Sequence, residues 1–117
     1  MRSLSSLLKA VGVIVGSGWV SLAYAGGVVT GTVQQVLVRA SDGLVYTVIN
    51  GTASGQPSCA THTYWMIMNE TSDVGHKQYA LLLQDQATNA QVTIYGNGTC
   101  TRWADGEDID SIVSITQ

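Results

Sequence analysis

The sequence predicts a small, mainly β domain in which five strands form a barrel and a single helix lies between the third and fourth strands. Three observations lead to this expectation. They are the order of strand-like and helix-like segments, the placement of the two cysteines, and an N-terminus that resembles a secretion signal. Removal of residues 1–25 from the 117-residue chain leaves 92 residues, which is enough for one domain, residues 26–117.

The first 25 residues have the three-part order of a secretory signal peptide. Arg2 and Lys9 precede an almost uncharged stretch, and Ala23-Tyr24-Ala25 supplies the small residues that signal peptidase requires. A membrane anchor or a buried helix is the alternative, but the apolar stretch is shorter than the roughly 20 residues of a spanning helix and contains three glycines. We expect cleavage after Ala25, a periplasmic or secreted protein, and no stable membrane insertion after cleavage.

The first two strands are expected to form a hairpin. Residues 28–38 are rich in valine and threonine, and their apolar alternation changes phase at Gln34-Gln35, which predicts a β-bulge. Residues 41–43 (Ser-Asp-Gly) form a turn signal, and residues 44–49 then read as the second strand. Both phases of this second strand are apolar, so we expect it to be covered on both sides.

The rest of the chain supplies one helix and three strands. Residues 50–58 contain the only proline and predict a loop, and residues 63–68 read as the third strand. Residues 76–88 predict a helix with Asp73 as its cap. Its expected buried face consists of Tyr79, Ala80, Leu82, Leu83 and Ala87. Residues 91–95 and 108–116 complete the set as the fourth and fifth strands.

This order of elements matches the OB-fold, a five-stranded Greek-key barrel. In that fold the third and fifth strands are parallel neighbours and the fourth runs antiparallel to the fifth. The start of the third strand and the end of the fourth therefore share one end of the barrel, where Cys59 and Cys100 would lie. In an oxidising compartment we expect a Cys59–Cys100 disulfide. A reactive thiol or half of a zinc site is the alternative, but the chain has no C-x-x-C motif.

Several stretches also resemble a group of small exported proteobacterial proteins that is similar to the OB-fold B subunits of bacterial AB toxins of the subtilase-cytotoxin and pertussis-like kind. They are residues 58–60, Trp65, and residues 79–83, 92–100 and 103–108, which together extend over nearly the whole mature chain. The resemblance implies a disulfide-bonded OB-fold, a pentameric ring and glycan binding. No sugar-contacting motif of those toxins matches residue by residue, so the resemblance assigns no binding residue.

Net charge argues against nucleic acid as a partner. Two of the five cations lie in the signal, which leaves three cations and eight acids and a formal charge of −5 for the mature chain. Such a chain repels phosphate backbones and anionic lipid surfaces.

Candidate site residues are few. The acidic run of residues 105–110 offers oxygen ligands but lacks an EF-hand pattern, and strand alternation predicts that its acids face water while Ile109 faces inward. We therefore expect no metal and no cofactor. Six aromatic side chains could stack on a sugar or a peptide: Tyr46, Tyr64, Trp65, Tyr79, Tyr95 and Trp103. Trp103 is the best ligand-binding candidate, because it lies among polar residues between two strands.

The sequence favours a non-catalytic module that binds a glycan or a protein. It contains no nucleophile elbow, zinc-protease motif or phosphate-binding glycine loop, so we do not expect an enzyme. Glu107 and Asp108 are adjacent on a predicted strand, where their side chains would point to opposite faces. The alternative is a structural, envelope-associated protein that assembles with itself and has no small-molecule ligand.

Overall fold

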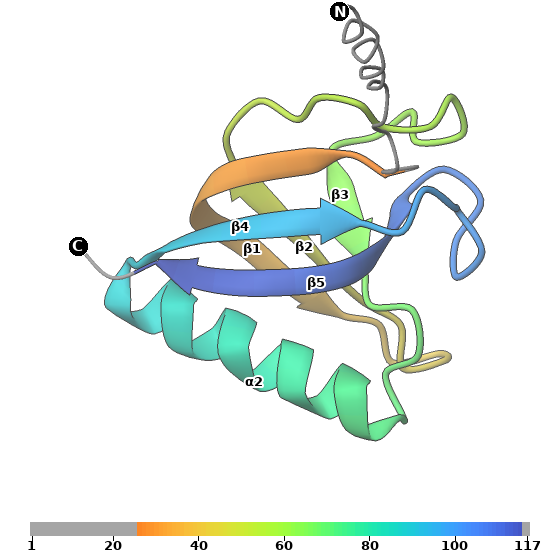
Figure 1. Ribbon diagram of the computed structural model, residues 1–117. Helices are drawn as coiled ribbons and strands as arrows, with labels where there is room; N and C mark the ends of the chain where they lie inside the picture. Colours follow the sequence, from red (N-terminus) through yellow and green to blue (C-terminus); the bar gives the residue numbers. More distant parts are fainter. Residues whose placement is uncertain (1–25, 116–117) are drawn as a thin grey trace, which may run out of the picture.

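The computed structural model describes residues 26–115 (Figure 1). The strands are β1 (Val28–Val38), β2 (Val45–Asn50), β3 (Tyr64–Met66), β4 (Gln91–Gly96) and β5 (Glu107–Ile115), and the helix α2 (Asp73–Thr88) lies between β3 and β4. The expected signal peptide and its cleavage site after Ala25 lie outside the described residues.

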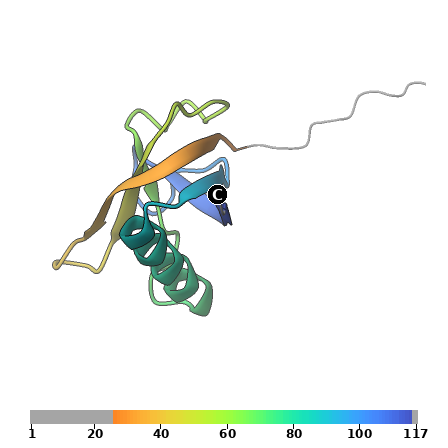
Figure 2. The ribbon, with the colours of Figure 1, turned by 90° about the vertical axis from the view of Figure 1, so that its left-hand side faces the viewer.

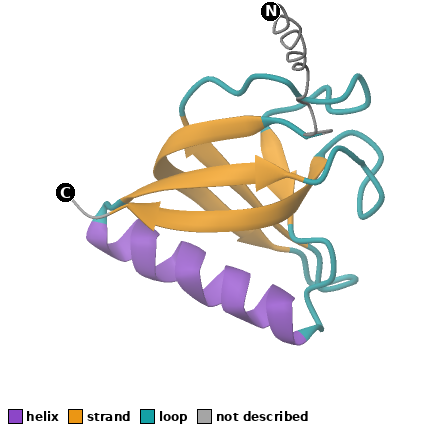
Figure 3. Ribbon diagram, viewed as in Figure 1, coloured by secondary structure: helices purple, strands orange, loops and turns teal. Residues whose placement is uncertain are grey.

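The five strands close into a barrel in the order β1-β2-β3-β5-β4. All neighbouring pairs are antiparallel except β3 and β5, which are parallel. The expected OB-fold topology is thereby confirmed, including the position of the helix. Figure 3 shows the two classes of element, with the strands forming the barrel and α2 beside it.

Strand β1 pairs with a different strand along each of its halves, and it bends between the two pairings. Its first half pairs with β4 from Val28 to Thr32, and its second half pairs with β2 as far as Val38. The register shifts between Val33 and Gln35, which confirms the bulge expected at Gln34. An inserted residue bends a strand and increases its twist, and this is how one long strand closes a small barrel.

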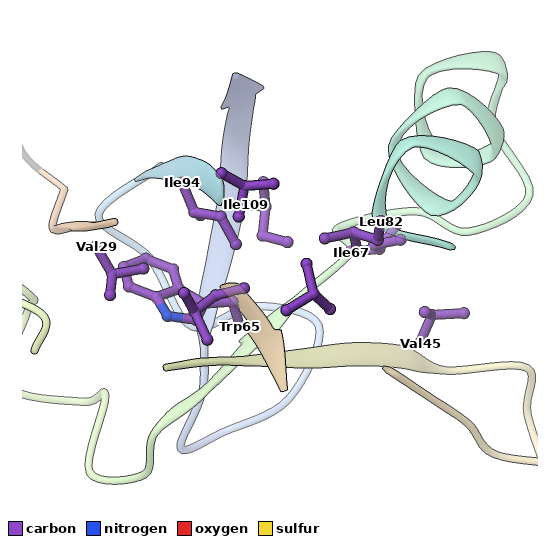
Figure 4. Close-up of a cluster of buried hydrophobic side chains, with 10 residues drawn as sticks. Val29, Val45, Trp65, Ile67, Leu82, Ile94 and Ile109 are labelled. Carbon is purple, nitrogen blue, oxygen red and sulfur yellow. The ribbon is translucent and has the colours of Figure 1, made fainter. Parts of the chain in front are cut away.

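The barrel interior is filled by aliphatic side chains around Trp65, which is 1% exposed. Figure 4 shows Leu82 extending from α2 toward side chains of the strands. The core residues are Val29, Val33, Val45, Ile49, Trp65, Ile67, Leu82, Val92, Ile94 and Ile109. In β2 the buried residues alternate with partly exposed ones, so Tyr46 and Val48 lie on the outer face, which is only partly covered.

Helix α2 lies along one side of the barrel, below β4 and β5 in both views (Figures 1 and 2), and packs against β1 and β5. Its N-cap is Ser72, whose hydroxyl accepts a hydrogen bond from the Gly75 amide at 2.9 Å. The prediction of Asp73 as the cap is wrong by one position, since Asp73 lies in the first turn. No helix within residues 26–115 has the length and apolar character needed to cross a membrane.

The buried stripe of α2 is narrower than expected. Its buried residues are Gly75, Leu82 and Asp85, and Tyr79 is partly buried against the core. The predicted face is wrong for Ala80, Leu83 and Ala87, which are exposed. Asp85 takes a buried position instead, because Ser114 of β5 donates a hydrogen bond to its Oδ1 atom at 2.9 Å.

Candidate functional site

A groove lined by aromatic side chains lies outside the barrel, over β1, β2 and β3. Its volume is about 260 Å³. We call it the aromatic groove, and its lining residues are Leu37, Arg39, Leu44, Tyr46, Tyr64, Met66 and Trp103. Trp103 comes from the β4–β5 loop, residues 97–106, which Figure 1 shows at the same end of the barrel as the β1–β2 turn.

Strand alternation places the groove on the outer face. Trp65 points into the core, so its neighbours Tyr64 and Met66 point outward. Met66 is nevertheless fully buried, because Gly106 of the β4–β5 loop packs onto it. A Cβ atom at Gly106 would lie 2.6 Å from the Tyr64 ring and 2.7 Å from the Met66 sulfur. Only glycine lets the loop approach the strand so closely.

One wall of the groove continues into a row of stacked rings. The centroids of Tyr46 and Tyr64 lie 4.8 Å apart with an interplanar angle of 27°. His62 also stacks on Tyr64, with a centroid distance of 5.3 Å and an interplanar angle of 4°. Stacked rings restrict one another's rotation, so this wall is preorganised.

Trp103 and Arg39 also line the groove and contact each other. The Arg39 guanidinium lies 4.2 Å from the centroid of the Trp103 ring, which is a cation–π contact. Two hydrogen bonds from Arg39 to Asp42, at 3.0 and 2.8 Å, fix the guanidinium, and they lower the pKa of the Asp42 carboxyl. Arg39 covers one face of the ring, and Trp103 nevertheless remains 41% exposed.

Tyr64 connects the ring stack to the carboxylate of Asp105. Its hydroxyl donates a hydrogen bond to Asp105, whose other carboxylate oxygen lies 3.2 Å from the Nδ1 atom of His62. Burial raises the pKa of Tyr64 to about 12, and the Asp105 carboxylate acts in the same direction. The phenol therefore stays protonated over the physiological range and acts as a hydrogen-bond donor to Asp105.

Ion pairs hold the loop that carries Trp103. Arg102 donates two hydrogen bonds to Glu70, at 2.9 and 3.1 Å, and its guanidinium lies 3.5 Å from Asp42. The hydrogen bonds from Arg102 lower the pKa of Glu70. The loop is thereby tied both to the β3–α2 connection and to the β1–β2 turn.

Asp108 organises the same loop from inside. It is fully buried and accepts hydrogen bonds from both the hydroxyl and the amide of Thr101, from the Thr99 hydroxyl, and from the Arg102 amide, at 2.6 to 3.1 Å. Burial raises the pKa of Asp108, but these hydrogen bonds outweigh it and the net pKa is lowered.

The expectation that the acids of residues 105–110 face water is wrong for Glu107 and Asp108, which are fully buried, and holds for Asp110, which is exposed. Ile109 is buried, as expected. These acids do not converge on one point. Within residues 26–115, no group of three or more His, Cys, Asp or Glu side chains could hold a metal ion.

A disulfide fixes the loop covalently at Cys100, three residues before Trp103. Cys59 and Cys100 are bonded, with their Cα atoms 6.2 Å apart, which confirms the pairing expected from the topology. The bond joins the β2–β3 connection to the β4–β5 loop. Three kinds of restraint therefore position Trp103: the disulfide, the Arg102 ion pairs and the Asp108 hydrogen bonds.

No family model, curated protein or solved structure matches the chain.

The six aromatic candidates separate clearly in the structure. Tyr46, Tyr64 and Trp103 line the groove, whereas Trp65 fills the core and Tyr79 packs against it. Tyr95 lies on β4, away from the groove, beside Gly26 and Gly96. Sequence reasoning missed Arg39 and His62, and it considered Asp105 only as part of the acidic run, because only the folded barrel brings these three segments together.

Thr61, His62 and Asp105 do not have the arrangement of a catalytic relay. A nucleophile–histidine–carboxylate relay needs its two partners on different nitrogens of the imidazole ring. Here the Thr61 hydroxyl and the Asp105 carboxylate both lie 3.2 Å from Nδ1 of His62. His62 therefore cannot pass a proton between them.

Proposed function

We propose that this chain is an exported, non-catalytic binding module that holds a glycan in its aromatic groove. The observation that carries the proposal is a groove lined by the half-exposed Trp103 indole and two stacked tyrosine rings, with carboxylates and guanidinium groups beside it. Location in the periplasm or outside the cell is part of the proposal, and the Cys59–Cys100 disulfide supports it because disulfides persist in oxidising compartments.

The chemistry of the groove fits a sugar ring. Sugar rings present apolar C–H faces and a rim of hydroxyl groups, so they pair with aromatic faces surrounded by charged hydrogen-bonding groups. Arg39 and Arg102 are each ion-paired with carboxylates, so they do not form an unpaired cationic surface. A hydroxyl-bearing ring therefore suits the groove better than a phosphate group.

The size of the groove limits how much of a glycan it holds. At about 260 Å³ it is slightly smaller than the roughly 300 to 1,000 Å³ of typical small-molecule sites. We therefore expect it to bind one sugar residue at the end of a chain, with modest affinity per site.

The test begins with a glycan array probed with the oxidised protein of residues 26–117, followed by calorimetric titration of the best ligand. Trp103→Ala should weaken binding at least about tenfold, because it removes the stacking face. Leu83→Ala is the matched control, since Leu83 is 40% exposed on α2 and Trp103 is 41% exposed in the groove. Retention of no glycan by the folded protein, or equal affinity of the Trp103 variant and the parent, would refute the proposal.

A further inference from the structure

Glu107 is an isolated acid inside the protein, away from the aromatic groove. Its side chain is fully buried, and none of the ion pairs formed within residues 26–115 involves it. The Oε2 atom accepts hydrogen bonds from the amides of Gly27, at 2.9 Å, and Gly98, at 3.0 Å. The Oε1 atom is buried and has no hydrogen-bond partner. A buried carboxylate oxygen without a partner carries a large desolvation cost.

The surroundings of this carboxylate are built from glycines. A Cβ atom at Gly96 would lie 1.9 Å from the Oε2 atom of Glu107, and a Cβ atom at Gly26 would lie 2.9 Å from the same atom. Gly26 also lies against the backbone of Gly96, where a Cβ would approach the carbonyl oxygen to 2.0 Å. Gly26 therefore lies directly against the carboxylate of Glu107, and a residue with a side chain would not fit at this position.

We propose that the missing partner of Glu107 is the α-ammonium group that cleavage after Ala25 creates on Gly26. Hydrolysis of the Ala25–Gly26 peptide bond adds the hydroxyl of water to the Ala25 carbonyl carbon and a proton to the Gly26 nitrogen. The released amine takes up a further proton and becomes a cation. Removal of the signal thus supplies a positive charge at the residue that already touches the buried carboxylate, and the ion pair fixes the mature N-terminus on the barrel.

The pairing explains why this end of the barrel contains an acid. Before cleavage the Gly26 nitrogen belongs to an amide and carries no charge, so the precursor buries an uncompensated carboxylate. Breaking a buried ion pair is far more destabilising than losing a surface pair. The mature protein should accordingly be more stable than a form that keeps even one residue before Gly26, in which the amine lies up to about 3.6 Å farther along the chain.

The first experiment compares four proteins in a thermodynamic cycle. They are the chain starting at Gly26, the same chain with Ala25 retained, and Glu107→Gln in each background. Glutamine keeps the shape and an oxygen acceptor but removes the charge. In the Gly26 background we expect Glu107→Gln to raise the unfolding equilibrium constant at least about tenfold, and in the Ala25 background to have a smaller effect or to stabilise. Equal effects in both backgrounds would overturn the proposal.

The second experiment reads the amine directly and does not require equal stability of the variants. After cleavage the chain has two primary amines, the Gly26 α-amine and Lys77, because the other lysine, Lys9, is in the signal. An acylating reagent applied near neutral pH should label Gly26 several-fold more slowly in the parent than in folded Glu107→Gln. Lys77, whose side chain is 76% exposed, serves as the internal control and should react equally in both. Unchanged labelling of Gly26 would refute the pairing.

The intact mass of the exported protein tests the premise of the proposal. A mature chain that begins at Gly26 is expected, and one that begins elsewhere would refute the pairing. The glycan measurements do not depend on this result, since the groove and Glu107 share no residue.

Discussion

Glu107 and Asp108 show how two adjacent acids can be buried for separate reasons. Their side chains lie on opposite faces of β5, so they meet different parts of the β4–β5 loop, and only Glu107 also reaches the segment before β1. Glu107 receives amide hydrogen bonds from Gly27 and Gly98, and Asp108 receives four hydrogen bonds from residues 99–102. The oxygens of each carboxylate accept hydrogen bonds from backbone amides outside the strands, which would otherwise lack a partner.

Replacement of Asp108 by asparagine should destabilise the protein by about 3 kcal/mol at neutral pH, because an amide cannot accept from all four donors. The lowered pKa of Asp108 means that its contribution is complete above the ordinary aspartate pKa and is lost as the pH falls through the folded-state value. Urea denaturation between pH 7 and pH 2 should therefore show a shallower acid dependence in Asp108→Asn. Asp110→Asn, at an exposed position of the same strand, is the control. An acid profile identical to that of the parent would contradict this role of Asp108.

Tyr64 provides a second prediction at the scale of one residue. Its pKa is raised to about 12, so the folded state disfavours its ionisation, and the corresponding stability is present below about pH 10 and is lost as the pH rises toward 12. An absorbance titration of the mature protein should show a tyrosine transition near pH 12. That transition should be absent from Tyr64→Phe and retained in Tyr79→Phe. Its survival in Tyr64→Phe would show that burial and Asp105 do not control this phenol.

At the scale of elements, the sequence predicts the strands well and the helix face poorly. The β1 limits agree with the expected residues 28–38, and the phase change at Gln34-Gln35 locates the bulge, because alternation with period two depends only on neighbouring residues. The helix face depends on what lies opposite it. Since Ser114 of β5 offers a hydrogen bond, Asp85 is buried although the expected apolar face did not include it.

The orientation of α2 can be tested with two neighbouring leucines. Leu82→Ala should cost about 3 kcal/mol, because Leu82 is fully buried in the barrel core. Leu83→Ala should cost less than about 0.5 kcal/mol, because Leu83 points to solvent on the adjacent position. Chemical denaturation of both variants checks this difference. Similar losses would mean that the helix is rotated about its axis relative to the barrel.

The disulfide joins two elements of the fold, the β2–β3 connection and the β4–β5 loop. Cys59→Ser or Cys100→Ser should lower stability by about 2 to 5 kcal/mol, the usual effect of removing a native disulfide from a small domain. Since the bond anchors the loop that carries Trp103, reduction should also weaken ligand binding in protein that remains folded. Thermal unfolding with and without reductant is the measurement. An unchanged melting temperature would show that the bond contributes nothing to the fold.

For the whole molecule, topology was predictable and the groove only in part. The order of elements and the two cysteines together select one barrel, because the parallel pairing of β3 with β5 brings Cys59 and Cys100 to the same end. Trp103 could be singled out because it lies among polar residues outside the strands. Tyr46 and Tyr64 were among the six aromatic candidates, but their place beside Trp103 could not be predicted. Arg39 was not a candidate, because only the closed barrel brings these separate segments together.

The closed barrel also restricts how copies of the chain could assemble. Strand β5 pairs with β3 only at Glu107 and Asp108, and α2 lies beside its remaining edge, where Gln78 donates a hydrogen bond to the Asp110 carbonyl at 3.1 Å. Covering an edge in this way opposes strand addition from another molecule. An assembly should therefore form through side-chain surfaces rather than by extension of the sheet.

Solution mass tests both whole-molecule hypotheses, because the ring-forming binding module and the self-assembling envelope protein both predict an oligomer. The resemblance to ring-forming toxin subunits predicts five times the chain mass, and a ring has a physical advantage here. A groove that holds one sugar binds weakly, but several grooves on one face can raise the overall affinity by about 10² to 10⁴. Light scattering on the oxidised protein of residues 26–117 should thus give a pentamer, and its dissociation by dilution should weaken binding to a multivalent glycan surface but not to a free monosaccharide. A monomer at high concentration would exclude both the ring and the self-assembling envelope protein, and would leave the groove as a single weak site.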